Sequence, residues 1–187
     1  MITYQPVSND SELKQILALQ QQNLAVNLSD EQIQTQGFVT VVHNLPLLQK
    51  MHLQAPSIIA KDEDTLAGYC LAMTKELKAD VPVLVPMFDT LETLNFQDVP
   101  LKEAAYIAVG QVCVAAAYRG KGIFEGMYQA YKKEYSRQYS FAITEIAHRN
   151  KRSLQAHTKV GFQILLAYLS PDDNQIWEIV VWDWRQD

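Results

Sequence analysis

The sequence predicts an α/β fold of the α+β kind, in which helices flank a mixed central sheet of about six or seven strands. Residues 104–117 are almost all apolar, which is typical of a strand buried on both faces. In the helical pattern that follows, Ile123, Met127 and Tyr131 fall on one face. Residues 141–146 then indicate another strand. Because strand, helix and strand in this order form a parallel unit with a right-handed crossover, we expect one βαβ unit within the sheet.

The N-terminal part of the chain predicts a short strand followed by helices. Residues 2–5 favour the strand, and the polar residues 8–12 supply N-cap candidates for a helix that runs to about Gln22. A capping-box pattern in residues 29–32 indicates the start of a shorter helix. Another helix is expected to begin after Asn44, with a proline in its first turn, where proline is tolerated.

Two antiparallel hairpins are expected, one on each side of the βαβ unit along the chain. The first pairs residues 57–61 with residues 66–74 across an acidic turn. The second pairs residues 162–169 with residues 176–184 across a turn that contains proline, aspartate and asparagine. The helix that precedes the second hairpin is expected to run from an N-cap at Asn150 to a glycine stop at Gly161.

Residues 81–88 form an apolar stretch that two prolines interrupt. Proline removes a backbone donor and fixes its own φ, so this stretch is predicted to be neither a regular helix nor a central strand. A short helix over residues 88–94 is expected to follow. The stretch itself has three interpretations, which are a packed loop, a lid over a substrate and a contact between subunits.

The junction between the apolar strand and its helix favours an anion. The first amides of a helix have no partners within it, and the helix dipole places partial positive charge there. Gly120 and Gly122 have no side chains to hold a phosphate away from those amides, while Arg119 and Lys121 add full positive charge. An ordinary strand-to-helix turn would use the same glycines for their backbone freedom, so both interpretations stay open.

Composition indicates one globular domain over residues 1–187, with 48% apolar and 20% charged residues. The net charge of −5 argues against a nucleic-acid partner, since such surfaces are normally basic. No apolar run is long enough to span a membrane, and the N-terminus has no pattern of a signal peptide. We therefore expect a cytoplasmic protein with no membrane partner.

Cysteine and histidine give no sign of a metal site or a disulfide framework. Cys70 and Cys113 lie inside apolar strand-like runs and are predicted to be small buried hydrophobic residues. The four histidines show no paired short spacing of the zinc type, either with one another or with the cysteines. We predict that no metal is bound.

Two motifs carry a resemblance to a known family. The first is Val112-x-Val114-x-x-x-Tyr118-Arg119-Gly120-Lys121-Gly122, and the second, after a helix and a strand, is Asn150-x-x-Ser153-x-x-Ala156-His157-x-Lys159-x-Gly161-Phe162. In order and separation they resemble the GNAT superfamily of acetyl-CoA-dependent N-acetyltransferases, and the order of elements over nearly the whole chain is compatible with it. The resemblance implies a GNAT-like fold whose parallel βαβ unit carries the coenzyme site.

The resemblance also implies which residues contact acetyl-CoA, the cosubstrate. The amides of the Arg119–Phe124 turn would hold the pyrophosphate, and the edge of the strand at Gln111–Val114 would pair with the pantetheine amides. Gly110 would mark a bulge that splays this strand from its parallel neighbour. The basic residues His148, Arg149, Lys151 and Arg152 are either coenzyme contacts or solvated surface. The implied coenzyme-binding residues are Gln111, Val112, Cys113, Val114, Arg119, Gly120, Lys121, Gly122, Ile123, Phe124 and Asn150.

Three residues depart from the family pattern. Ala116 stands where proline is usual, and Phe124 stands where glycine or alanine is usual, so its ring must point away from the pyrophosphate or narrow the site. His157 stands where a tyrosine typically protonates the departing thiolate. A histidine cation is a competent acid near neutral pH, which makes His157 a catalytic candidate; packing on a helix face is the alternative.

Glu145 is the candidate for the base. It lies in an otherwise apolar strand, five positions before Asn150, where some protein N-terminal acetyltransferases of this family carry a base. A carboxylate there is expected to face polar chemistry or, alternatively, solvent at the end of the strand.

The leading hypothesis is an N-acetyltransferase in which a small-molecule or peptide amine attacks the thioester directly within a ternary complex. Catalysis would come from positioning and from amides that polarise the thioester carbonyl. The alternatives are a non-catalytic acyl-CoA-binding or sensing module of the same fold and an interaction domain that uses residues 81–88. The acceptor stays open, and so does assembly into a homodimer.

Overall fold

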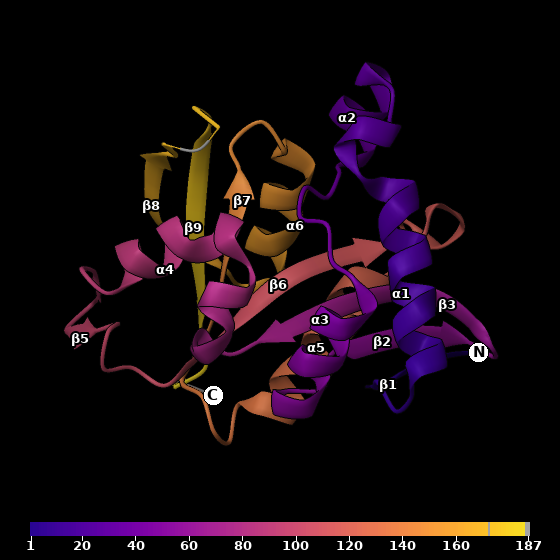
Figure 1. Cartoon of the computed structure of the whole chain (residues 1–187), viewed down its shortest axis with the longest axis horizontal. Coiled ribbons are helices and arrows are strands. Elements are labelled where there is room, and N and C mark those ends of the chain that lie inside the picture. Colours follow the sequence, from indigo (N-terminus) through magenta and orange to yellow (C-terminus); the bar gives the residue numbers. More distant parts are fainter. Residues whose placement is uncertain (172, 186–187) are drawn as a thin grey trace.

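A seven-stranded mixed sheet organises residues 1–171 and 173–185, the part of the chain that the computed structural model describes (Figure 1). The strand order is β1-β2-β3-β6-β7-β9-β8, and only β6 and β7 run parallel among these neighbours. Both predicted hairpins and the predicted βαβ unit are confirmed. The strands are β1 (Ile2–Pro6), β2 (Ile58–Asp62), β3 (Thr65–Met73), β6 (Tyr106–Val114), β7 (Phe141–Ala147), β8 (Gln163–Leu169) and β9 (Ile176–Asp183).

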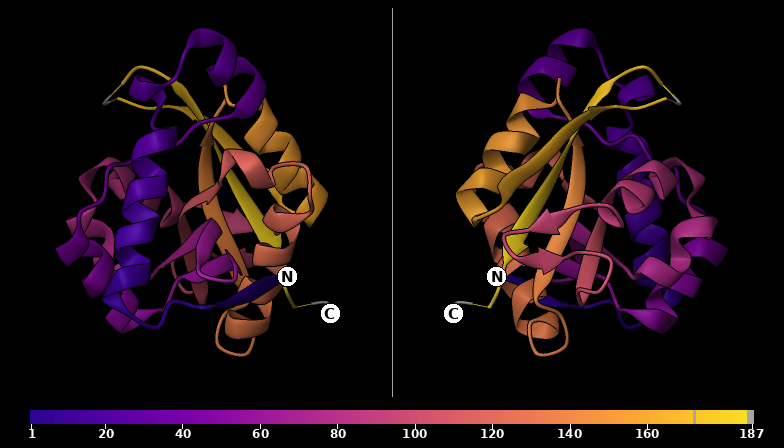
Figure 2. Two further views of the ribbon diagram at one scale, coloured as in Figure 1. Left: turned by 90° about the vertical axis from the view of Figure 1, so that its right-hand side faces the viewer. Right: turned by 90° about the vertical axis from the view of Figure 1, so that its left-hand side faces the viewer.

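Helices cover both faces of this sheet, as the side views in Figure 2 show. On one face lie α1 (Asp10–Asn23), α3 (Leu45–Gln54) and α4 (Val85–Leu91), and on the other lie α5 (Ile123–Tyr135) and α6 (Lys151–Val160). The shorter α2 (Asp30–Gln36) projects beyond the sheet (Figure 1). Each face has its own apolar core, so alternate residues of the central strands are buried on opposite sides. A small ribbon of β4 (Asn95–Phe96) and β5 (Val99–Pro100) completes the named elements.

The expected helix starts are confirmed by their caps. Ser29 and Gln32 form a complete capping box at α2, and the side chain of Asn44 accepts a hydrogen bond from the amide of Leu47 at α3. Asn150 caps α6 in the same way, and Gly161 ends that helix with φ 121°. These signals are local in sequence, which is why they could be identified without tertiary information.

The expectation for residues 81–88 is wrong in one respect. A regular helix, α4, begins at Val85, and Pro86 lies in its first turn, where no intrahelical amide bond is lost. Four residues of the stretch are buried in the core on the face of the sheet that α1, α3 and α4 cover, namely Val81, Leu84, Met87 and Phe88. Half of the stretch is therefore buried, which favours the first of its three interpretations, a packed loop.

No helix within residues 1–171 and 173–185 has both the length and the apolar character needed to cross a membrane. The same residues contain no group of three or more His, Cys, Asp or Glu side chains arranged to hold a metal ion.

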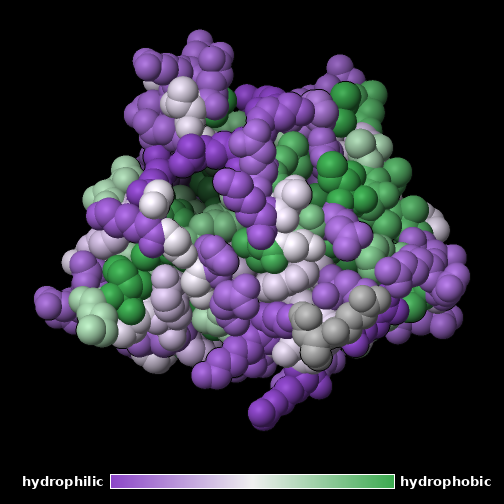
Figure 3. All heavy atoms as spheres, turned by 180° about the vertical axis from the view of Figure 1, so that it is seen from behind, coloured by the Kyte–Doolittle hydropathy of each residue, from purple (hydrophilic) through white to green (hydrophobic). Residues whose placement is uncertain are grey.

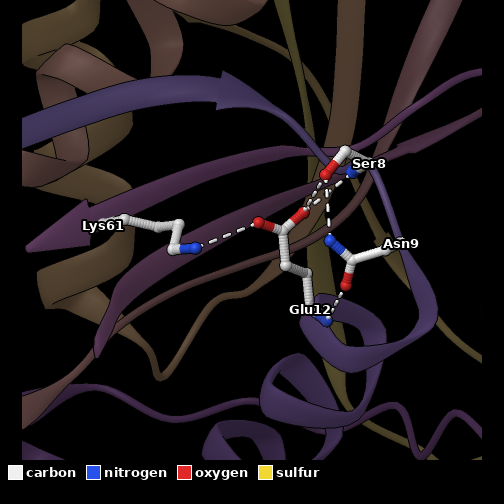
Figure 4. A network of polar contacts seen from close by, with 4 residues as sticks. All are labelled: Ser8, Asn9, Glu12 and Lys61. Atoms are coloured by element: carbon white, nitrogen blue, oxygen red, sulfur yellow. Dashed lines mark hydrogen bonds and ion pairs between the residues drawn. The ribbon is translucent and has the colours of Figure 1, made fainter. Parts of the chain in front are cut away.

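A buried carboxylate joins the start of α1 to the strand β2 (Figure 4). Glu12 is 3% exposed, and its carboxylate accepts two hydrogen bonds from Ser8, one from the backbone amide at 2.8 Å and one from the hydroxyl at 3.1 Å. It also forms an ion pair with Lys61 at 3.1 Å. The side chain of Asn9 caps the helix by accepting from the amide of Glu12. Burial acts to raise the pKa of Glu12, but the contacts with Ser8 and Lys61 outweigh it and lower the pKa.

We expect Glu12→Gln to lower the free energy of unfolding by about 1–3 kcal/mol at neutral pH, because it leaves Lys61 and Ser8 without their charged acceptor. A group whose pKa is lowered by folding stabilises above its unfolded pKa and loses that effect as the pH falls, so the deficit should shrink in acid. Urea unfolding at several pH values measures both effects. The exposed Glu31→Gln, in the first turn of α2, is the control, and equal losses for the two variants would contradict the role of the buried network.

Candidate active site

The sheet opens between its two parallel strands. β6 and β7 pair only from Tyr106 to Ala108, and a register shift against β3 leaves Gly110 as a bulge. The hydroxyl of Thr144 donates to the carbonyl of Val109 at 2.8 Å, at the point where the strands part. Beyond it, Gln111–Val114 pairs with β3 alone. The bulge expected at Gly110 is confirmed, and it gives the middle of the sheet a strand edge that faces an opening.

The glycine turn lies at the far end of β6, at the N-terminus of α5. Gly120 and Gly122 have φ values of 73° and 76°, which favour glycine over any other residue. Gly122 occupies the N-cap position, and as a glycine it has no side chain with which to cap the first amides of α5. A Cβ built on either glycine would meet no atom within 4 Å, so both glycines border open space. The turn thus presents amides to an open region, as an anion site requires.

A cavity of about 340 Å³ runs from this turn along the open edge of β6. In Figure 3, which views the face of α5 and α6, the surface is hollowed beneath the polar projection at the upper left, and apolar residues lie inside the hollow. The predicted coenzyme residues that line the cavity are Val112, Cys113, Val114, Arg119, Gly120, Gly122, Ile123, Phe124 and Asn150. Arg152, one of the basic residues with two open interpretations, also lines it, and so do Phe38 and Lys159, to which the sequence interpretation gave no role.

Two predicted coenzyme residues already have partners within the chain. The guanidinium of Arg119 donates to Asn23 at 2.6 Å, to the side chain of Gln36 and to the carbonyl of Val114. The side-chain amide of Asn150 donates to the carbonyl of Phe38 at 3.0 Å while its oxygen caps α6. These contacts fasten residues 36–39 along the cavity, so Arg119 and Asn150 build its wall.

Phe124 resolves one departure from the family pattern. Its ring packs against the rings of Tyr128 and His157, with both centroids 5.0 Å away. The aromatic ring therefore packs at the edge of the core beneath α5, while Phe124 also lines the cavity. Lys121 lies over the ring of Tyr118, 5.4 Å from its centroid, and is outside the residues that line the cavity.

A second cavity, of about 70 Å³, lies in the opening between β6 and β7. Glu145 lines it, and the hydroxyl of Tyr168 donates to one carboxylate oxygen at 2.6 Å. Burial raises the pKa of Glu145 to about 7, despite the opposing effect of the Tyr168 hydrogen bond. A carboxylate with this pKa can accept a proton near neutral pH. Glu145 is partly buried and lies within β7, a position that favours the interpretation in which it faces polar chemistry.

His157 lies beside the same cavity but is only 1% exposed. One ring nitrogen, Nδ1, contacts the carbonyl of Ser153 at 2.8 Å, so it carries the proton and donates. Nε2 is then an acceptor for the hydroxyl of Tyr128 at 2.7 Å. Burial lowers the pKa of His157 to about 4, so the ring is neutral at pH 7. This environment corresponds to the packing interpretation of His157.

A buried polar network beside Gln111 was not found from the sequence. Gln111 accepts from Tyr69 and from Gln20, both at 2.7 Å, and donates to the carbonyl of Val41 at 2.9 Å. Gln20 also contacts His43 at 2.8 Å. These residues come from α1, the 37–44 loop, β3 and β6, and no local pattern links them. The network fixes the loop beside the bulge in β6, where both cavities share Phe38 and Val39.

The two parallel strands separate beside a glycine turn, and comparison with known proteins identifies the family of the chain. The model of the acetyltransferase (GNAT) family matches residues 28–162. The chain therefore belongs to the GNAT acetyltransferase family. No curated protein matches the chain in a sequence search.

Solved structures share this fold along nearly the whole chain. One is the NatC complex bound to Gag peptide and CoA, at 14% identity, with 97% of this chain and 98% of that chain covered and a TM-score of 0.62. Another is NAA60 from Arabidopsis thaliana in complex with acetyl-CoA, at 13% identity, 98% and 99% coverage and a TM-score of 0.62. A third is yncA from Salmonella typhimurium, a putative acetyltransferase with its cofactor acetyl-CoA, at 13% identity, 100% and 95% coverage and a TM-score of 0.62. At these identities the likeness shows the fold.

Proposed function

We propose that this protein transfers an acetyl group from acetyl-CoA to a primary amine by direct attack in a ternary complex. The observation that carries the proposal is the continuity of three features: the uncapped amides of the glycine turn, the unpaired edge of β6 and the carboxylate of Glu145. They follow one another along the opening in the sheet. Family membership and the coenzymes bound to proteins of the same fold support it.

The larger cavity fits acetyl-CoA as the cosubstrate. The amides of the Arg119–Phe124 turn would hold the pyrophosphate, and Arg152 and Lys159 on the same wall add positive charge. The backbone of Gln111–Val114 would pair with the pantetheine amides as a further strand would. When bound, acetyl-CoA supplies the acetyl group as a reactive thioester. Asn150 supports this site by holding Phe38 in the cavity wall.

Glu145 is proposed as the general base. The neutral amine gives one proton to Glu145, its nitrogen forms a bond to the acetyl carbon, and the carbon–sulfur bond breaks so that coenzyme A leaves as its thiolate. Glu145 is suited to this because its raised pKa, about 7, is close to the pH at which the reaction runs. Tyr168 would orient the carboxylate. We assign His157 to positioning, since a neutral ring whose two nitrogens both have partners holds no proton to release near pH 7.

A second candidate function is a non-catalytic acyl-CoA-binding module, and the buried neutral His157 in the position of the usual acid favours it. One experiment tests both. Calorimetric titration with acetyl-CoA and with coenzyme A measures binding, and release of free thiol in the presence of a broad panel of amines measures transfer. Binding with amine-dependent thiol release supports the acetyltransferase. Binding without any such release supports the module, and no binding contradicts both.

A further inference from the structure

The cavity beside Glu145 has an apolar wall that the proposed chemistry does not use. Leu84 and Met87, both buried, come from the proline-interrupted stretch and α4, and Val83 lies next to them with 45% of its surface exposed. Val39 and Val41 of the 37–44 loop line the same space. An exposed valine at the rim of an otherwise buried apolar wall is placed to meet whatever enters the cavity.

Charge in this cavity has one sign. Among the described residues that line it, Glu145 is the only aspartate or glutamate, and none is lysine or arginine. An ammonium or amine group would find its complement in Glu145. A free amino acid would bring a carboxylate close to Glu145 with no cation to balance it, and burial without a partner is costly for a charged group.

The polar groups around the cavity are mostly committed to the chain itself. Gln111 and Asn150 each use their side-chain oxygen and nitrogen within the protein, and the hydroxyl of Thr144 donates to Val109. The several hydroxyls of an amino sugar, or the second ammonium of a polyamine, would therefore be left with few partners here. The cavity volume, about 70 Å³, admits roughly five groups of the size of a water molecule at about 15 Å³ each.

We propose that the acceptor is a primary amine that carries a short, uncharged, apolar side chain next to its nitrogen, and that Val83, Met87 and Val41 select this side chain. The inference rests on the proposed acetyltransferase function. The nitrogen lies toward Glu145, and the side chain lies against the apolar wall. A small free amine and the first residue of a peptide share this chemistry.

Competing acceptors with acetyl-CoA test the selection. The panel contains isopentylamine, spermidine and glucosamine, and four peptides that differ only in their first residue, which is leucine, serine, lysine or aspartate. We expect kcat/KM to be at least ~10-fold higher for apolar members than for cationic, acidic or sugar members, since a few buried methylene groups are worth that much. Isopentylamine against the leucine peptide distinguishes a free amine from a chain terminus.

Val83→Asp should reverse the selection, because it places a carboxylate at the rim. We expect kcat/KM to fall at least ~10-fold for the leucine peptide and to rise for the lysine peptide, while the Kd for acetyl-CoA is unchanged. Leu53→Asp is the matched control, because Leu53 is 85% exposed on α3 and lines neither cavity. Faster transfer to spermidine, glucosamine or the lysine peptide by the wild type, or an unaltered preference in Val83→Asp, would overturn this inference alone. Transfer to no amine at all would overturn the acetyltransferase function and the inference with it.

Discussion

Replacing Gly122 with glutamate is expected to weaken acetyl-CoA binding by at least ~100-fold. Gly122 is the N-cap of α5 and borders the larger cavity, with no atom within 4 Å of the position a Cβ would take. The new carboxylate would stand where the pyrophosphate should bind. Two like charges about 4 Å apart repel by roughly 4 kcal/mol at an effective dielectric constant of about 20. Since about 1.4 kcal/mol is tenfold in affinity, even half of that repulsion exceeds a tenfold loss, and lost amide contacts add to it.

Gly122→Gln is the matched control, because it has nearly the same shape and the same backbone strain but no charge. Both variants force a non-glycine residue to adopt φ 76°, which costs roughly 1–2 kcal/mol of stability, so thermal unfolding should shift equally. Calorimetry should then find a much smaller loss of affinity for the glutamine variant, about tenfold or less. Retention of wild-type affinity by Gly122→Glu would show that the coenzyme binds away from this turn.

The glycine turn and the bulge could be predicted from the sequence because their causes are local. A buried apolar strand, a glycine pair and a helix pattern are adjacent along the chain, and Gly110 interrupts the same strand. The backbone angles at Gly120 and Gly122 are what such a turn requires. The helix caps at Ser29, Asn44 and Asn150 belong to the same category, since each satisfies amides no more than three residues away. The prediction that residues 81–88 contain no regular helix was wrong at Pro86, because a proline in the first turn of a helix cannot be told by sequence from a proline that breaks a helix.

The roles of the polar side chains depend on partners that are distant in sequence. Arg119 contacts Gln36 and Asn23, which are 83 and 96 residues away. The motif around Arg119 therefore predicted a phosphate contact, but it could not predict that the side chain forms part of the cavity wall. Glu145 acquires its raised pKa from burial, which outweighs the opposing effect of the hydrogen bond from Tyr168 on β8. For His157 the helix pattern allowed both a packed and a catalytic position, and its burial and the contact with Tyr128 on α5 favour the packed one.

Glu145→Gln is expected to lower kcat by about 10²–10⁴-fold, the usual contribution of a general base. In the wild type, kcat/KM should rise about tenfold per pH unit in acid and level off above pH ~7, because Glu145 accepts a proton only when ionised and its pKa is raised to about 7. The glutamine variant should lose this inflection. His157, with a pKa lowered to about 4, should add no inflection near its ordinary pKa. Glu178→Gln, on the neighbouring strand β9 and outside both cavities, should keep the wild-type profile.

Tyr168→Phe provides a second test, because it would leave the pH profile unchanged if the Glu145 carboxylate were merely structural. The Tyr168 hydrogen bond holds the pKa of Glu145 below the value that burial alone would give, so its removal should move the inflection to higher pH.

In Glu145→Gln, stability should change in the opposite sense to activity. A carboxyl group whose pKa is raised by folding costs stability above its unfolded pKa, and this cost grows as the pH rises from about 4.5 to about 7. Glu145→Gln should therefore unfold at a higher temperature than the wild type at pH 8 and show no such advantage at pH 4. Full activity in Glu145→Gln, or a profile that Tyr168→Phe does not move, would assign the base to another group.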